Sequence, residues 1–396
     1  MPPRPLLEFA ASRVCTLQPS PTLAVTERVR ALRRAGVEVI DLASGDPDFP
    51  TPVHIRQAAT AAIEAGDTHY VTAGGLPELR AAIAAKLAAD NGVQVDPDTE
   101  VLVTAGGKAA LFEAMQALVE PGTEVLILEP SWVSFAPMVQ LSGGTPVPVR
   151  LSADDGFRLT AERLAAVISP QTRILLVNSP NNPTGRVFDE AEWKVVRDAA
   201  VASDLLVFSD EIYEKILFDG RRHHSPASFP ELAGRTLTFN GFSKAYAMTG
   251  WRLGYVAAPR PLLAQIAKVH GHSATCVPGF TQRGAVAALA GPQTPIAEMV
   301  AAWDRRRRLA VPLLEQVPGV RCPLPQGAFY LFADVRAAGA TSVEVANRIV
   351  EQAHVAVMPG TAFGEAGEGF LRIALTTPDA QLQEALQRLQ RCLQGL

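Results

Sequence analysis

Seven short apolar segments dominate the stretch of chain between residues 101 and 257. Most are continuous runs of β-branched residues and leucine, a pattern typical of strands that are buried on both faces. They lie at residues 101–103, 125–128, 147–149, 174–177, 205–208, 237–239 and 253–257. Helical patterns separate most of them, at residues 107–118, 131–141, 160–168 and 189–202. This alternation predicts βαβ units, and therefore an α/β fold with a mostly parallel seven-stranded sheet sandwiched by helices.

The chain has a different character on either side of this region. Residues 22–35 predict a helix that Thr22 can cap. After about residue 295 the pattern predicts a long helix, several short strands and two further helices, at residues 295–316, 319–322, 328–334, 342–353, 355–358, 370–375 and the C-terminal end. A chain of 396 residues is too long for one compact core. We therefore expect an N-terminal segment (1–50) that joins a small α+β domain (296–396), and a large domain between them (51–295).

Charge and composition exclude several classes of protein. Hydrophobic residues make up 48% and charged residues 19% of the chain, which is an ordinary globular balance. The net charge of -4 argues against a nucleic-acid-binding surface, which needs clustered positive charge. One basic run, Arg305 to Arg308, lies in a helical stretch. We interpret it as a solvated or ion-paired helix face.

The cysteines and the hydropathy pattern indicate the cellular compartment. Cys15, Cys276, Cys322 and Cys392 lie far apart, which favours neither a disulfide framework nor a metal site. No apolar stretch is long enough to span a membrane, and Glu8 interrupts the N-terminal segment before it could form a signal peptide. We expect a cytoplasmic protein that associates with no membrane.

Polar clusters follow four of the predicted strands. They are Thr-Ala-Gly-Gly-Lys (104–108), Asn-Ser-Pro-Asn-Asn-Pro-Thr-Gly (178–185), Ser-Asp-Glu-Ile-Tyr (209–213) and the stretch from residue 239 to 254 that contains Ser243, Lys244 and Arg252. Ligands of a doubly wound sheet bind at the carboxyl ends of its strands. A glycine turn that opens a helix can also receive an anion. Asp210, at the end of a buried strand, needs a cation or several donors nearby. Taken alone, the first two clusters are more typical of tight, stiff turns than of a ligand site.

Together these clusters resemble a known family. The chain is similar to the fold-type I pyridoxal-phosphate aminotransferases of class I/II, specifically the bacterial aspartate aminotransferase branch. The resemblance runs from Thr22 to the C-terminal helix. The motifs that carry it, in order, are Gly-Asp-Pro-Asp-Phe (45–49), residues 105–108, 178–185 and 209–213, Ser-Lys-Ala-Tyr-Ala-Met-Thr-Gly-Trp-Arg (243–252) and Phe-Leu-Arg-Ile-Ala (370–374).

The resemblance implies a role for each residue around the cofactor, pyridoxal 5'-phosphate. Lys244 would hold the cofactor as a Schiff base and then act as the base that moves the substrate proton. Asp210 would face the pyridine nitrogen. Tyr213 and Asn182 would bind the phenolic oxygen, and Trp132 would stack on the ring, although it could also be a core aromatic residue that opens a helix.

The same resemblance implies a phosphate site that two subunits share. Arginine suits a phosphate dianion because its planar fork can bond two oxygens at once. The implied phosphate ligands are Gly106, Gly107, Lys108, Ser243 and Arg252, together with Tyr70 from the other subunit of a homodimer.

The substrate residues follow in the same way. Arg372 would clamp the α-carboxylate with help from Asn182 and the backbone of Gly45, and Lys108 and Thr22 would meet a distal carboxylate. The resemblance therefore implies amino-group transfer between an L-amino acid, aspartate or glutamate, and a 2-oxo acid such as 2-oxoglutarate. The branch more often has glutamine where this chain has Ala109.

Three alternatives stay open on the sequence. The same site could serve aromatic, prephenate-like or specialised biosynthetic substrates, or a β-eliminating lyase. A transcription regulator with an aminotransferase-like domain would need a DNA-binding module, for which we expect no room in the roughly 20 residues before the fold. Residues 271–278 predict an interface loop, in which His272 would either touch substrate or pack between subunits.

Overall fold

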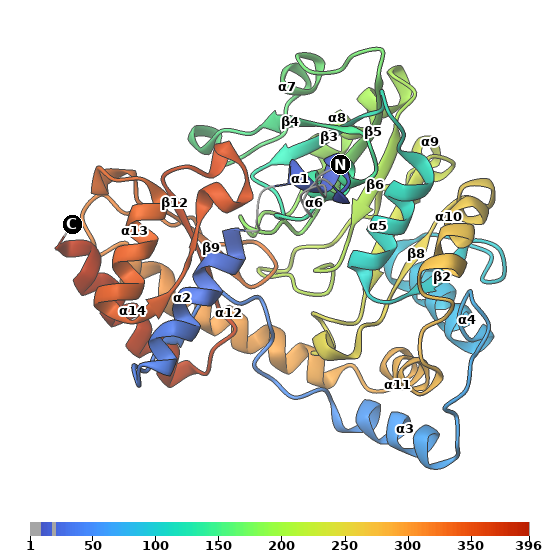
Figure 1. Ribbon diagram of the computed structural model, residues 1–396, viewed down its shortest axis with the longest axis horizontal. Helices are drawn as coiled ribbons and strands as arrows, with labels where there is room; N and C mark the ends of the chain where they lie inside the picture. The colour runs from blue at the N-terminus through green and yellow to red at the C-terminus, as the bar shows by residue number, and fades with distance from the viewer. Residues whose placement is uncertain (1–8, 18–20, 396) are drawn as a thin grey trace, which may run out of the picture.

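The computed structural model describes residues 9–17 and 21–395, with side chains from Val25 onward in the second range. Figure 1 shows a large part built around a sheet, and a smaller part in orange and red that contains the C-terminus. The blue helix α2 (Pro21–Arg34) lies against the smaller part. The N-terminal segment therefore packs on the C-terminal part of the chain.

The large sheet contains all seven of the predicted strands, and the predicted α/β class is confirmed. Its order is β2-β8-β7-β6-β5-β3-β4. The strands are β2 (Val101–Thr104), β3 (Glu124–Glu129), β4 (Thr145–Arg150), β5 (Thr172–Asn178), β6 (Leu206–Asp210), β7 (Thr236–Gly241) and β8 (Gly254–Ala257). Only β8 runs antiparallel to its neighbours β2 and β7. The sheet is therefore mostly parallel.

Helices cover both faces of this sheet, which explains why its strands are continuously apolar. On β5, Ile174 and Leu176 pack toward one face and Leu175 and Val177 toward the other, and all four are buried. The first face is covered by α5 (Gly107–Leu118), α6 (Phe135–Leu141) and α10 (Arg260–Ser273), and the second by α7 (Ala161–Ala165), α8 (Glu190–Ala202) and α9 (Pro230–Ala233).

Several helices of the large part were not predicted. They are α3 (Val53–Glu64), α4 (Pro77–Lys86), α11 (Gly279–Ala290) and, among those named above, α9 and α10; the short α1 (Ser12–Cys15) lies near α6. The sequences of α3, α4 and α11 are rich in alanine, so the apolar periodicity that identifies a helix is weak. The expected interface loop at 271–278 also begins later than predicted, because its first three residues complete α10.

The C-terminal layer consists of two small sheets and the helices beside them. One sheet pairs β1 (Ile40–Asp41) with β10 (Val355–Ala356), and the other has the order β11-β12-β9. These strands are β11 (Met358–Pro359), β12 (Phe370–Ala374) and β9 (Tyr330–Asp334); the helices are α12 (Thr294–Leu314), α13 (Ser342–Arg348) and α14 (Asp379–Gln394). β1 pairs with β10, so the N-terminal segment is part of this layer.

Several predicted elements were wrong in detail. Residues 319–322 form no strand, since only Arg321 makes an isolated bridge to Asp334. The strand expected at 355–358 is two short strands in different sheets. The helix expected at 131–141 starts at Phe135. Thr22 lies inside the first turn of α2 rather than at its cap, and its side chain is outside the described part.

The basic run on α12 is only partly a solvated face. Arg306 and Arg307 are 4% and 0% exposed. Arg306 bonds Asp48 at 2.8 Å and Asp379 at 2.7 Å, whereas Arg307 pairs with Asp219 at 2.7 Å. The ion-paired interpretation is confirmed, and solvation holds only for the flanking arginines at 305 and 308.

Two further observations concern the whole chain. All four cysteines are free, as expected. Among the described residues, no helix is long and apolar enough to cross a membrane. We propose that the division into residues 1–50, 51–295 and 296–396 describes the domains, on the basis of the two parts seen in Figure 1.

Candidate active site

Three neighbouring parallel strands bring the polar motifs to one edge of the sheet. In the registers of β5, β6 and β7, Asn178 lies beside Asp210, and Asp210 beside Phe239. The Asn178 Nδ2 group donates a hydrogen bond to the Asp210 carbonyl oxygen at 3.0 Å. Lys244 follows β7 on the same edge. The predicted strand-end site therefore exists as a set of adjacent side chains.

A cavity of about 280 Å³ opens at this edge. It is lined by residues from all four motifs: Gly107, Lys108, Leu111, Trp132, Asn178, Asn182, Asp210, Ile212, Tyr213, Asn240, Ser243, Lys244, Thr249 and Arg252. A second cavity of about 520 Å³ shares Lys108, Trp132 and Lys244 with the first and adds Gly45 and Arg372. The two cavities therefore meet at Lys244.

Burial shifts both central ionisable groups toward their neutral forms. It raises the pKa of Asp210 to about 7, against the opposing effects of the Ile212 N–H and the Lys244 ammonium. Burial also lowers the pKa of Lys244 to about 8. Arg372 and Arg252 lower it further, whereas Asp46 and Asp210 raise it. The cavity thus holds a carboxylate that needs a cation, and an amine that is easily made neutral.

Lys244 and Arg372 are held by backbone carbonyl groups of the segment that follows β1. Lys244 Nζ donates to the Gly45 carbonyl oxygen at 2.6 Å. Arg372 donates to the carbonyl oxygen of Ala43 and, at 3.1 Å, to Asn182 Oδ1. Because a Cβ at Gly45 would lie 2.1 Å from the Tyr330 hydroxyl, this position admits only glycine without a shift.

Two aromatic rings fix the plane of the Arg372 guanidinium. Its Cζ lies 4.4 Å from the ring centre of Tyr330 and 4.8 Å from that of Phe363. The Tyr330 hydroxyl also lies 2.9 Å from the Tyr213 hydroxyl. The Arg372 Nε atom is buried and has no partner among the described residues. The guanidinium is therefore oriented but keeps a free donor, an arrangement that suits a carboxylate ligand.

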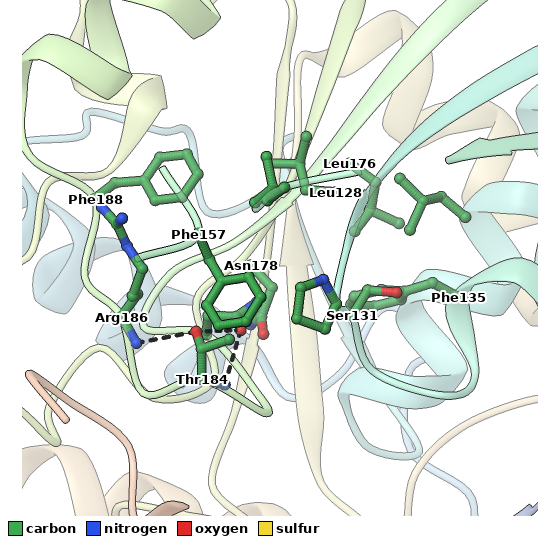
Figure 2. Close-up of a pocket in the computed structure, with 13 residues that line it drawn as sticks. Leu128, Ser131, Phe135, Phe157, Leu176, Asn178, Thr184, Arg186 and Phe188 are labelled. Carbon is green, nitrogen blue, oxygen red and sulfur yellow. Dashed lines mark hydrogen bonds between the residues drawn. The ribbon is translucent and has the colours of Figure 1, made fainter. Parts of the chain in front are cut away.

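The loop that carries Asn182 is stiffened from within. Thr184 donates to Asn181 Oδ1 through its backbone N–H at 3.1 Å and its hydroxyl at 2.7 Å. A gap of about 10 Å³ lies beside this loop and is lined by Thr184, Leu128, Phe157, Leu176 and Phe188 (Figure 2). A gap of that size has room for about one water molecule. It is therefore a packing defect beside the loop rather than a ligand site.

The glycine turn before α5 and Arg252 form the other end of the first cavity. A Cβ at Gly106 would lie 2.8 Å from Arg252 Nη2, and Gly106 has a φ of +89°, so the close approach requires glycine. Arg252 itself has a φ of 52° and donates to the Thr249 carbonyl oxygen at 2.9 Å. Lys108 lies at the N-terminus of α5, and its Nζ is 4.7 Å from the Trp132 ring centre.

These features fit pyridoxal 5'-phosphate. Neither Arg252 nor Lys108 forms an ion pair with a carboxylate of the described residues, and both flank a helix N-terminus, where a phosphate is favoured. Asn240 presents an Nδ2 donor that is buried, lines the cavity and has no partner in the described part. The buried Asp210 lies in the same cavity and is suited to a protonated ring nitrogen.

Some predicted residues lie outside the two cavities. Tyr70 is 88% exposed and His272 is exposed, and neither lines them. Conversely, sequence reasoning missed Tyr330, Asn240 and Asp46, all of which contact or face the predicted residues. Asp46 lies in a quoted motif, which could have indicated it. Tyr330 opens an apolar strand, and no sequence signal separates it from a core aromatic residue.

A buried polar cluster lies behind the loop that carries Asp210 and Tyr213. Glu211, Glu214 and His223 place possible metal-ligand atoms within 4.8 Å of one another. However, Glu214 pairs with the Lys86 ammonium, and the Asn91 amide donates to Glu214 at 2.7 Å. Lys86 therefore compensates the charge of Glu214, and Glu211 accepts hydrogen bonds from Ser209, Ser225 and Asn91, so the protein itself supplies partners for these carboxylates.

Comparisons with known proteins place this site in a family. The model of aminotransferase class I and II matches residues 37–389. The aspartate aminotransferase of Geobacillus stearothermophilus is 40% identical over 97% of this chain and 99% of its own length. A probable aspartate/prephenate aminotransferase of Aquifex aeolicus is 40% identical over 98% and 99%. A solved structure of Thermus thermophilus aspartate aminotransferase with maleate has a TM-score of 0.92 at 40% identity, covering 97% of this chain and 99% of that one.

The lowered pKa of Lys244 predicts how the cofactor-free protein takes up pyridoxal 5'-phosphate. Only the neutral amine attacks an aldehyde, so the rate of attachment should rise with pH and level off above about 8. Because Asp46 raises this pKa, Asp46→Asn should move the midpoint to lower pH. Stopped-flow absorbance at a series of pH values measures both. A midpoint near the ordinary lysine value of 10.5 would contradict the burial argument.

Proposed function

The chain belongs to the class I and II aminotransferases and is a pyridoxal-phosphate-dependent aminotransferase, and from this we propose that its substrates are aspartate or glutamate and a 2-oxo acid such as 2-oxoglutarate. One observation carries the choice of substrate: two cations, Arg372 and Lys108, line the cavity that contains Lys244. A dicarboxylic substrate supplies one carboxylate for each. The Thermus relative was solved with maleate, itself a dicarboxylate.

In the proposed reaction, Lys244 carries the proton that leaves the substrate. The bound cofactor, attached through Lys244, supplies the electron sink for the bond broken at the substrate Cα. The Lys244 amine, when it is not attached to the cofactor, would take the proton from the substrate Cα and deliver it to the cofactor carbon that accepts the amino group. With a pKa of about 8, about a tenth of the Lys244 amine is neutral at pH 7, far more than at the ordinary lysine value of 10.5, and a base requires this neutral form.

Asp210 and Tyr213 hold the ring of the cofactor in its reactive state. The Asp210 carboxylate accepts a hydrogen bond from the ring nitrogen and keeps it protonated, and that cation in turn stabilises a carboxylate which burial disfavours. Tyr213 and Asn182 bind the phenolic oxygen, and Trp132 covers one face of the ring. In the described structure the Tyr213 hydroxyl bonds Tyr330, so this contact is exchanged or shared when the cofactor binds.

The phosphate occupies the end of the first cavity near the N-terminus of α5. Backbone N–H groups at Gly106, Gly107 and Lys108, the Ser243 hydroxyl and the Arg252 guanidinium bind it. Since this group makes no contact with the reacting bonds, its binding energy fixes the position of the ring relative to Lys244 and Asp210.

The substrate α-carboxylate binds Arg372, beside Asn182 and the backbone of Gly45. The ring contacts of Arg372 and its bonds to Ala43 and Asn182 hold the guanidinium in one plane before substrate arrives, which reduces the entropy lost on binding. Lys108 receives the distal carboxylate, whereas the predicted role of Thr22 falls on a side chain outside the described part. Aromatic or prephenate-like substrates are the second candidate, because the Aquifex relative carries prephenate in its name.

The substrate proposal predicts the outcome of single half-reactions. Aspartate and glutamate should bleach the absorbance of the lysine-bound cofactor about 100-fold faster per unit concentration than alanine, because a paired distal carboxylate is worth a few kcal/mol. Lys108→Met should lower the rates with aspartate and glutamate about tenfold and leave that with alanine unchanged. Faster bleaching by phenylalanine would overturn the substrate assignment. Release of ammonia together with a 2-oxo acid, with the cofactor left in its aldehyde form rather than its amino form, would indicate a β-eliminating lyase.

A homodimer with shared sites is the second part of the proposal. Tyr70 is 88% exposed, and on the neighbouring helix α3 Val53 and Ile63 are 56% and 49% exposed. Exposed large apolar side chains on adjacent elements mark an interaction surface. Tyr70 lines neither cavity of its own chain, so it is free to reach the phosphate of a second copy.

Subunit complementation tests this arrangement. Lys244→Ala and Tyr70→Ala chains, refolded together, form mixed dimers in which one site has both residues intact, so roughly a quarter of wild-type activity should return beyond the residual activity of Tyr70→Ala alone. As the matched control, Lys244→Ala with Arg252→Ala should regain none, because both residues serve the site of their own chain. Failure of the first mixture to gain activity over its separate components would contradict a shared site.

A further inference from the structure

One face of helix α2 forms a wall of the second cavity. The residues that contribute are Val25, Thr26, Val29, Arg30 and Arg33. Their spacing of three and four residues puts them on the same side of the helix. Val29 packs into a small buried cluster with Val39, Val350 and Ala356 of the C-terminal layer. This packing fixes the rotation of the helix, and with it the direction in which Arg30 projects.

The charges around this cavity are strongly unbalanced. Five cationic side chains line it: Arg30, Arg33, Lys108, Lys244 and Arg372. Asp41 is the one carboxylate among its lining residues, and Asp41 Oδ1 already accepts the backbone N–H groups of Ala43 and Ser44 at 2.9 and 3.1 Å. A cavity of this kind concentrates anions, and it has more positive charge than one α-carboxylate neutralises.

Most of these cations have a partner among the described residues, but Arg30 has none there. Arg372 bonds Asn182 and Ala43, and Arg33 donates to the Val39 carbonyl oxygen at 3.1 Å. Arg30 forms no hydrogen bond or ion pair with any residue of the described part. On the same helix, by contrast, Arg28 pairs with Glu351 at 2.6 Å. Arg30 is therefore a guanidinium that lines the substrate cavity with all its donors available.

We propose that Arg30 is a specificity-determining residue that binds the distal carboxylate of a dicarboxylic substrate together with Lys108. This inference rests on the proposed aminotransferase function and adds a second cation, from α2, to the one from α5. An arginine fork can bond both oxygens of a carboxylate, whereas lysine offers a single point of contact. Arg30 therefore fixes the orientation of the distal carboxylate in addition to neutralising its charge.

The placement of Arg30 also explains selection by chain length. Helix α2 packs on the C-terminal layer through Val29 and the Arg28–Glu351 pair, and β12 of that layer carries Arg372. Arg30 and Arg372 therefore belong to one packed unit. Lys108 belongs to the large sheet part. The span between the two arginines is set by that packing, and a ligand whose two carboxylates match it is preferred.

Binding of unreactive carboxylates to the cofactor-loaded enzyme tests the proposal. Dissociation constants of succinate, glutarate, adipate and butyrate are measured from the change in cofactor absorbance, for wild type, Arg30→Gln and Arg34→Gln. Arg34 is exposed in the last turn of the same helix and does not line the cavity, so it is the matched control. Arg30→Gln should weaken the preferred dicarboxylate about tenfold and leave butyrate within about twofold, and Arg34→Gln should change neither.

A charge reversal provides an independent readout. In Arg30→Glu, the ratio of kcat/KM for ornithine over glutamate should rise at least about tenfold, because the distal ammonium of ornithine then meets a carboxylate. An unchanged ratio of glutarate to butyrate affinity in Arg30→Gln overturns the role of Arg30, while Lys108→Met still tests the proposed function separately. A wild-type enzyme that binds butyrate as well as every dicarboxylate overturns the dicarboxylic substrate itself.

Discussion

The burial of Asp210 and Lys244 at one edge of the sheet is the constraint on which the site depends. The same burial raises the pKa of Asp210 to about 7 and lowers that of Lys244 to about 8, because each charged form loses hydration there. A buried carboxylate that lacks a cation favours a ligand with a protonated nitrogen. A lysine whose pKa is close to neutral pH can act as a base. Both properties follow from the position of β6 and β7 inside a sheet that is covered on both faces.

The second constraint is that the site is assembled from two packed parts. Sheet-end motifs supply Asp210, Lys244 and Arg252, whereas Arg372 comes from β12 in the C-terminal layer. The segment after β1 connects the two parts, because its carbonyl oxygens at residues 43 and 45 accept hydrogen bonds from Arg372 and Lys244, respectively. A substrate that binds Arg372 and reacts beside Lys244 would therefore contact both parts.

The sequence predicted the sheet well because its strands are short and apolar, and because all except the edge strand β4 are largely buried on both faces, so the pattern is independent of distant contacts. It also predicted the motif residues, because they follow neighbouring parallel strands whose carboxyl ends lie at the same edge of the sheet. Elsewhere in the chain, contacts between residues distant in sequence determine which side chains are buried and which segments form strands. Arg306 and Arg307 look like a solvated face until Asp48 and Asp219, distant in sequence, are found beside them. Residues 319–322 are apolar enough for a strand, but they make only one bridge, and Tyr330 is distinguished from a core aromatic residue only by its neighbours.

The identity of the lysine that holds the cofactor is the most direct test of this account. Two lysines, Lys108 and Lys244, line the cavity, and burial lowers the pKa of both. The cofactor-loaded protein can be reduced with borohydride, digested and mapped by mass spectrometry. We predict one pyridoxyl-modified peptide, with the label on Lys244, and no label in Lys244→Ala. A label on Lys108 in the wild-type protein, or a reducible link that survives in Lys244→Ala, would contradict the central assignment.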